Sequence, residues 1–247
     1  MSRLLDETVP VARRTMNMFF LIDTSGSMDG AKIGSLNSAM ENIIPILKEI
    51  SDNNADALIK VAVLEFSSGC QWMYPEPKEL DDFSWQDLEA DGMTSLGEAC
   101  QELNAKLSRS RGYMNSGSGS FAPVVILMSD GIPTDDFETG LSLLRTNNWF
   151  KSAIKVSIAI GDDCDKQILA QFAGNSEAVI TVHNTDALKK IIRIVSVTSS
   201  RVASSSASVG NGTTKQDDVI DQIKDQTKDI KGADMGTEIT GDEDDWD

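Results

Sequence analysis

Short apolar runs rich in β-branched residues recur along this chain, with longer amphipathic segments between them. The runs have the pattern of strands buried on both faces, and they cover residues 18–22, 59–66, 124–128, 154–160 and 178–182. The amphipathic segments have the pattern of helices, and they cover residues 33–50, 96–107, 137–144, 166–172 and 187–197. Strands that alternate with helices form parallel β-α units. The sequence therefore predicts an α/β fold, a doubly wound and mostly parallel sheet flanked by helices.

Three local features modify this pattern. Pro45 lies inside the first predicted helix, so we expect a kink or an early end there. Residues 69–85 indicate a hairpin or an edge strand around residues 72–74, interrupted by two prolines. Residues 108–123 are rich in serine and glycine and are interpreted as a loop.

The composition changes after Val202. Residues 203–216 have the Ser/Gly-rich composition of a flexible linker, and residues 217–247 hold twelve acidic residues and three lysines. We therefore predict an N-terminal extension (1–16), one folded domain (17–202), a linker (203–216) and a flexible acidic tail (217–247). Ile220, Ile223 and Ile230 lie near one helical stripe of this tail. Two interpretations stay open: a solvated acidic segment, or a recognition segment that folds on a basic partner surface.

Overall charge and cysteine content restrict the classes of function. The formal net charge is -17, which makes nucleic acids and anionic membranes poor partners. The three cysteines stand far apart without framework spacing, which favours a reducing compartment. No signal peptide is visible, and no apolar run is long enough to span a bilayer. We expect a soluble, cytoplasmic protein.

Polar residues follow two of the predicted strands and precede one predicted helix. Asp23, Ser25 and Ser27 come directly after the first strand, Asp130 follows the strand at residues 124–128, and Thr94 precedes the helix at residue 96. Because carboxyl ends of parallel strands meet at one edge, these five side chains can converge. Five oxygen donors without thiolate or imidazole suit Mg²⁺ or Mn²⁺. A plain turn and helix cap could explain the first three residues, but not the matching positions of Thr94 and Asp130.

Other candidate residues have simpler explanations. Asp135, Asp136 and the acidic stretch at 161–165 precede predicted helices and are interpreted as caps. The single histidine, His183, lies at a strand end and is interpreted as a satisfied or surface residue rather than a base. No nucleotide-binding loop is present, and no serine has a general base placed beside it by sequence. We predict that the chain is not an enzyme.

Three ordered motifs, "DTSGS", "TSLGEA" and "SDGIPTD", resemble the von Willebrand factor A domain with its metal-ion-dependent adhesion site. The resemblance covers roughly residues 17–202. It implies that Asp23, Ser25 and Ser27 match the D-x-S-x-S motif, Thr94 the single threonine and Asp130 the second aspartate. It also implies an Mg²⁺ ion that is shared with an Asp or Glu of a partner protein. The chain departs from the common pattern at two positions that hold no ligand, Met93 and Ser129.

Within that superfamily the motifs are most similar to the bacterial TerY type. This resemblance implies a cytoplasmic adaptor of tellurite-resistance and stress-response systems, whose partners would be a kinase-like protein and a metal-dependent phosphatase. The alternative resemblance is to A domains that work with MoxR-type AAA+ ATPases in chelatase-like or cofactor-insertion complexes. Neither resemblance implies a nucleic acid or a membrane as partner.

Overall fold

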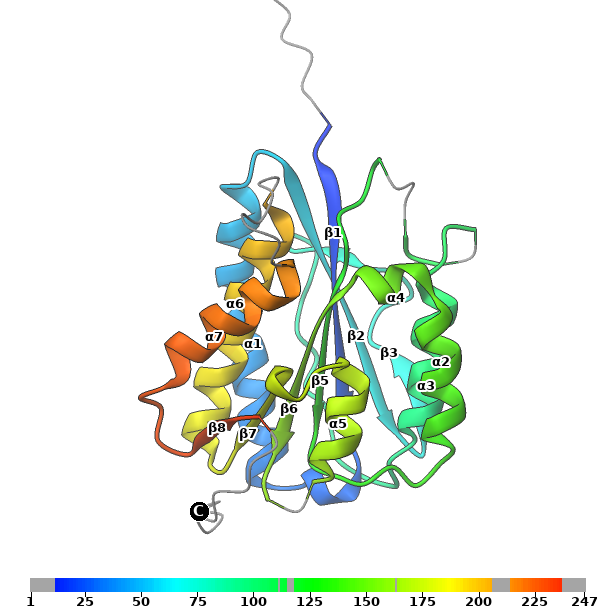
Figure 1. The fold of residues 1–247 in the computed structure, drawn as a ribbon, viewed down its shortest axis with the longest axis vertical. Coiled ribbons are helices and arrows are strands. Elements are labelled where there is room, and N and C mark those ends of the chain that lie inside the picture. Colours follow the sequence, from blue (N-terminus) through cyan, green and yellow to red (C-terminus); the bar gives the residue numbers. More distant parts are fainter. Residues whose placement is uncertain (1–11, 111, 115–117, 163, 206–213, 237–247) are drawn as a thin grey trace, which may run out of the picture.

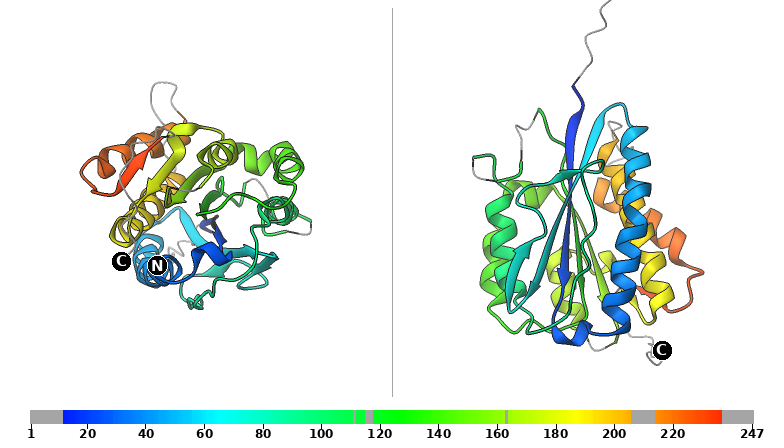
Figure 2. Two further views of the ribbon diagram at one scale, coloured as in Figure 1. Left: turned by 90° about the horizontal axis from the view of Figure 1, so that it is seen from below. Right: turned by 180° about the vertical axis from the view of Figure 1, so that it is seen from behind.

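The computed structural model describes residues 12–110, 112–114, 118–162, 164–205 and 214–236. Within these residues one eight-stranded sheet runs in the order β3-β2-β1-β5-β6-β7-β8, with β4 also paired to β2. Helices cover both faces of the sheet: α1, α6 and α7 lie on one side, and α2 to α5 lie on the other (Figure 1). Figure 2 shows the same layers from below and from behind.

The strands are β1 (Arg14–Asp23), β2 (Ala57–Ser67), β3 (Gly69–Trp72), β4 (Lys78–Glu79), β5 (Val124–Ser129), β6 (Ile154–Ile160), β7 (Val179–Val182) and β8 (Ala233–Met235). The helices are α1 (Ala31–Asp52), α2 (Leu96–Lys106), α3 (Phe137–Thr146), α4 (Asn148–Ser152), α5 (Lys166–Ala173), α6 (Thr185–Ser204) and α7 (Lys215–Thr227). Two short 3₁₀ helices are η1 (Gly26–Met28) and η2 (Ser176–Ala178).

The predicted α/β class is confirmed. The five central strands, β2, β1, β5, β6 and β7, are parallel, and antiparallel strands occur at the two sides of this group. The edge strand predicted near residues 72–74 is β3, which forms an antiparallel hairpin with β2. β1 begins at Arg14, slightly inside the predicted N-terminal extension.

Strand β1 shows why the apolar runs are continuous. Its Met18, Phe20 and Ile22 side chains belong to the core cluster that includes residues of α1 and α6. Phe19 and Leu21 belong to the cluster on the opposite face, with residues of α2, α3 and α5. Because successive side chains of a strand point to opposite faces, a strand covered on both sides needs apolar residues at every position.

Helix α1 is not broken at Pro45, so the expectation of an early end is wrong. Pro45 lies on the exposed side of the helix. There, water can bind the backbone carbonyl that loses its helical partner, while the buried face of α1 stays intact.

The C-terminal region differs most from the sequence prediction, because the fold continues past residue 202. Helix α7 forms where the isoleucine stripe predicts a helix, but it packs against its own domain through Val219, Ile220 and Ile223. The exposed side of α7 carries acidic residues such as Asp221. Charge composition therefore describes only one face of this helix, and burial of the apolar face stabilises its packed position.

Two further contacts hold this region. A capping box starts α7, with Thr214 Oγ1 accepting from the Asp217 amide at 3.2 Å and the Asp217 carboxylate accepting from the Thr214 amide at 3.0 Å. Strand β8 adds an antiparallel strand beside β7. Residues 206–213 of the predicted linker and 237–247 of the predicted tail lie outside the described residues.

None of the helices in the part of the chain that the structure describes is both long enough and apolar enough to cross a bilayer.

Candidate metal centre

The register of the sheet brings Asp23 and Asp130 to one edge. Strand β1 ends at Asp23 and strand β5 ends at Ser129, and the two strands are parallel, with Ile22 opposite Met128. The chain turns away directly after each strand, so the polar residues that follow both strands meet at their carboxyl ends. The sequence predicts this edge correctly.

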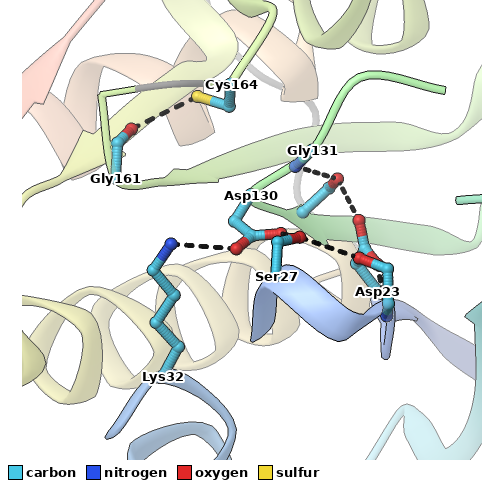
Figure 3. Close-up of polar contacts among 9 residues, drawn as sticks. Asp23, Ser27, Lys32, Asp130, Gly131, Gly161 and Cys164 are labelled. Atoms are coloured by element: carbon cyan, nitrogen blue, oxygen red, sulfur yellow. Dashed lines mark hydrogen bonds and ion pairs between the residues drawn. The ribbon is translucent and has the colours of Figure 1, made fainter. Parts of the chain in front are cut away.

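The side chains of the D-x-S-x-S segment are connected to Asp130 by hydrogen bonds (Figure 3). Ser27 Oγ donates to Oδ1 of Asp130 at 2.7 Å, and the Oγ atoms of Ser25 and Ser27 are 3.1 Å apart. Asp23 Oδ1 accepts from the backbone amide of Ser25 at 2.8 Å. Since Ser27 gives its hydrogen to Asp130, it accepts from Ser25 in the contact between the two hydroxyls, and one lone pair of its oxygen remains for another ligand.

Thr94 is held in place by the loop that follows Asp130. Its carbonyl accepts from the amide of Thr134 at 2.9 Å, and its amide donates to Oγ1 of Thr134 at 3.1 Å. Asp135 caps α2 through the amides of Gly97 and Glu98, at 2.9 Å and 2.8 Å. Asp135 therefore caps α2, and not the helix that it precedes, which is the one that the sequence had indicated. The interpretation of Asp136 as a cap of the helix that follows it is confirmed, because it accepts from the amide of Thr139 at the start of α3.

Gly131 shows how closely the oxygens converge. A β-carbon at this position would lie 3.2 Å from Oγ1 of Thr94, 3.6 Å from Oδ2 of Asp23 and 3.8 Å from Oγ of Ser27. Three candidate ligands therefore surround one point, and the bonds of Ser27 connect Ser25 and Asp130 to the same group. The structure brings all five predicted residues together.

The donor set fits a hard cation. Three hydroxyl oxygens and two carboxylates meet where a glycine leaves space, and such oxygens suit Mg²⁺ or Mn²⁺. Asp23 and Asp130 are buried, while Ser27 is exposed, so the group opens to solvent on that side. Burial raises the pKa of the Asp23 carboxyl, hydrogen bonds from Ser129 and Ser25 oppose the rise, and the nearby charge of Asp130 adds to it.

Two contributors were missed by sequence reasoning. Ser129 Oγ donates to Oδ2 of Asp23 at 2.5 Å and accepts from the amide of Gly131 at 3.2 Å. Its hydroxyl group and its place beside Asp130 in the sequence are the available signal for this role, whereas the family resemblance marks Ser129 only as a departure from the common threonine. Lys32 forms an ion pair with Asp130, with 2.9 Å between Nζ and Oδ2. No motif pointed to this lysine.

The remaining titratable candidates form contacts within the fold, away from the candidate site. His183 is buried between Asp162 and Asp234, with 2.7 Å from Nδ1 to Oδ1 of Asp162 and 2.9 Å from Nε2 to Oδ2 of Asp234. Both ring nitrogens of His183 lie beside carboxylates, which fits a structural role for this residue. In the 161–165 stretch, Asp165 caps α5 as expected, whereas Asp162 faces His183.

Fold and site together define an α/β domain with an oxygen-rich site at the carboxyl edge of its sheet. The chain belongs to the von Willebrand factor type A domain family, whose sequence profile matches residues 17–194. No curated protein sequence matches the chain.

Several solved structures share this fold. Proximal thread matrix protein 1 from the mussel byssus, solved with a zinc-occupied MIDAS motif, has 18% identity and a TM-score of 0.57, covering 74% of this chain and 47% of that one. A von Willebrand factor type A protein from Catenulispora acidiphila has 18% identity and a TM-score of 0.57, covering 76% and 43%. The pilus adhesin SpaC from Lactobacillus rhamnosus GG has 12% identity and a TM-score of 0.57, covering 86% and 30%. The part that matches this chain therefore makes up less than half the length of each of these three proteins.

Proposed function

We propose that this chain is a metal-dependent protein-binding module. It binds Mg²⁺ or Mn²⁺ through Asp23, Ser25, Ser27, Thr94 and Asp130, and the ion binds an Asp or Glu side chain of a partner protein. The observation that carries this proposal is the convergence of five oxygen donors at the space beside Gly131. The zinc-occupied MIDAS motif of the mussel protein supports a divalent ion in this kind of site.

The charge of the donor set explains why an external carboxylate would bind. Ser25, Ser27 and Thr94 are neutral, so only the two aspartates offset the charge of the ion. A hard cation with neutral hydroxyl ligands remains a strong attractor for another anionic oxygen. The side chain of Ser27 is exposed, which gives such an oxygen a route to the ion.

The surface around the site suits a protein partner. Met93 and Ile132 are 56% and 59% exposed, and each adjoins a residue that frames the site. Met93 precedes Thr94 and Ile132 follows Gly131, on two loops connected by the Thr94–Thr134 hydrogen bonds. Large apolar side chains at the rim of a polar site add contact area for a folded partner.

A binding role fits the chain better than catalysis. The described histidine has both ring nitrogens beside aspartates and takes no part in the candidate site. The sequence motifs favour the TerY type, an adaptor between a kinase-like protein and a metal-dependent phosphatase in a tellurite-resistance or stress-response system. The alternative partner is a MoxR-type AAA+ ATPase. The net charge of -17 disfavours nucleic acids and anionic membranes.

Calorimetry with MgCl₂ tests the metal site. Asp23→Ala removes a carboxylate that faces the space beside Gly131, so we expect no measurable Mg²⁺ binding while the circular dichroism spectrum stays unchanged. Asp29→Asn is the matched control, since Asp29 is exposed on the same loop and holds no predicted ligand role. Unchanged affinity in Asp23→Ala would contradict the assignment.

A further inference from the structure

We propose that Lys32 is a built-in counter-cation of the metal site, which pairs with Asp130 when the ion is absent and competes with the ion for this carboxylate. The inference rests on the proposed function, because it concerns how strongly the same site holds its metal. Lys32 thereby lowers the affinity of the site for its metal by competing for the Asp130 carboxylate.

The geometry places the ammonium group at the oxygen of Asp130 that the serines leave free. Lys32 lies in the first turn of α1, and its Nζ is 2.9 Å from Oδ2 of Asp130 (Figure 3). The other oxygen, Oδ1, accepts from Ser27 at 2.7 Å. The side chain of Asp130 is fully buried at 0% exposure, whereas that of Lys32 is 21% exposed. The long lysine side chain therefore has access to solvent, and the aspartate does not.

The charges of the site require such a group. Asp23 and Asp130 are both buried and belong to one hydrogen-bonded group, so they repel each other unless a cation is present. Among the described residues, the ion pair that reaches these carboxylates is Lys32–Asp130. An uncompensated buried carboxylate is strongly destabilising, so Lys32 keeps the metal-free site folded.

The same contact opposes metal binding. A divalent ion held by Asp130 lies close to the ammonium group, so Lys32 either stays and repels the ion or turns into solvent and loses its ion pair. Both routes weaken metal affinity. We expect removal of the charge to tighten Mg²⁺ binding about tenfold, the size of one charged hydrogen bond. A purely structural lysine gives the opposite sign, since its loss would loosen Asp130 and weaken binding.

The test is calorimetry of the full chain with MgCl₂. We expect Lys32→Gln to bind Mg²⁺ about tenfold more tightly than the unmodified chain, and Lys32→Arg, which keeps the charge, to remain within about twofold. Lys48→Gln is the matched control, because Lys48 lies on the same helix and pairs with Asp81 at the surface. This control removes the same charge from the chain and should leave the affinity unchanged.

Thermal unfolding gives a second measurement. In EDTA, Lys32→Gln should melt at a lower temperature than the unmodified chain, and excess Mg²⁺ should raise its melting temperature by more. Lys32→Met, which keeps the aliphatic stem, replaces the glutamine variant if that variant does not fold.

The outcomes separate the two proposals. Equal or weaker Mg²⁺ binding in the folded Lys32 variants overturns the counter-cation role while the metal site stands. An unmodified chain that binds neither Mg²⁺ nor Mn²⁺ overturns the proposed function itself, and the counter-cation role with it.

Discussion

Two serines orient the carboxylates of the candidate site by giving away their hydroxyl hydrogens. Ser27 donates to Asp130 and Ser129 donates to Asp23, so each carboxylate is fixed by a neighbour on a different segment. Buried carboxylates that accept hydrogen bonds cannot turn toward water. The hydrogen bonds fix their orientation, so their remaining lone pairs stay available to a ligand in the site. At the scale of single residues, the site therefore depends on small contacts around one open space.

Gly131 gives a direct test of that space. Gly131→Ala would place a methyl group 3.2 Å from Oγ1 of Thr94 and close to the oxygens of Asp23 and Ser27, so we expect Mg²⁺ affinity to fall at least about tenfold. The backbone of Gly131 is not in the left-handed region, so the chain should still fold. Gly34→Ala in α1, where a β-carbon meets nothing within 4 Å, is the control. If calorimetry showed that both variants bind Mg²⁺ equally well, the space beside Gly131 would not be the metal site.

At the scale of helices and strands, the C-terminal elements α7 and β8 complete the core. Helix α7 packs on α6, and β8 extends the sheet beside β7. The backbone amide of His183 donates to the carbonyl of Gly232 at 2.8 Å, and its ring contacts Asp234 in β8. These contacts tie a segment with the composition of a solvated tail to the end of the parallel sheet.

The packing of α7 predicts that substitutions on its buried and exposed faces will have very different effects on the stability of the protein. Ile223 is 1% exposed, so Ile223→Ala should lower the free energy of unfolding by about 3 kcal/mol. Asp221→Ala changes an exposed residue of the same helix and should cost less than about 0.5 kcal/mol. Urea unfolding followed by circular dichroism measures both. Equal stabilities for the two variants would mean that α7 does not pack against the domain.

At the scale of the whole molecule, the chain combines a large negative charge with the candidate cation site. Exposed carboxylates repel acidic partners at long range, and salt screens that repulsion. A partner carboxylate bound to a metal ion at close range is much less sensitive to salt. Metal-dependent and purely electrostatic binding can therefore be separated.

A capture experiment with candidate partners uses this difference. We expect a complex formed in Mg²⁺ to be released by EDTA but to survive about 0.3 M NaCl, which leaves a Debye length of only several ångströms. Substitution of the partner's contacting Asp or Glu by Asn or Gln should abolish capture. The identity of the captured protein decides between the kinase-like protein with its phosphatase and the AAA+ ATPase. A complex that survives EDTA would place the interface away from the metal.

Local patterns in the sequence were sufficient to predict the parallel strands of the core and to select the five candidate ligands. Continuous apolar runs arise because strands such as β1 are buried on both faces. Asp23 and Asp130 follow two such runs directly, so the rule that parallel strands share a carboxyl edge brings them together without any knowledge of side-chain contacts. Helix caps such as Asp136 are equally local, since donor and acceptor lie within one turn.

Away from this shared edge, only the tertiary structure decided which distant side chains meet. The isoleucine stripe of α7 predicts a helix but not its partner, because burial depends on the surface that the rest of the chain presents. The pairing of Lys32 with Asp130 joins residues 98 positions apart, and that of His183 with Asp234 joins residues 51 apart. The sequence shows which residues are charged, but not whether a charged side chain faces water or pairs with a buried residue. Only the packed chain determines this.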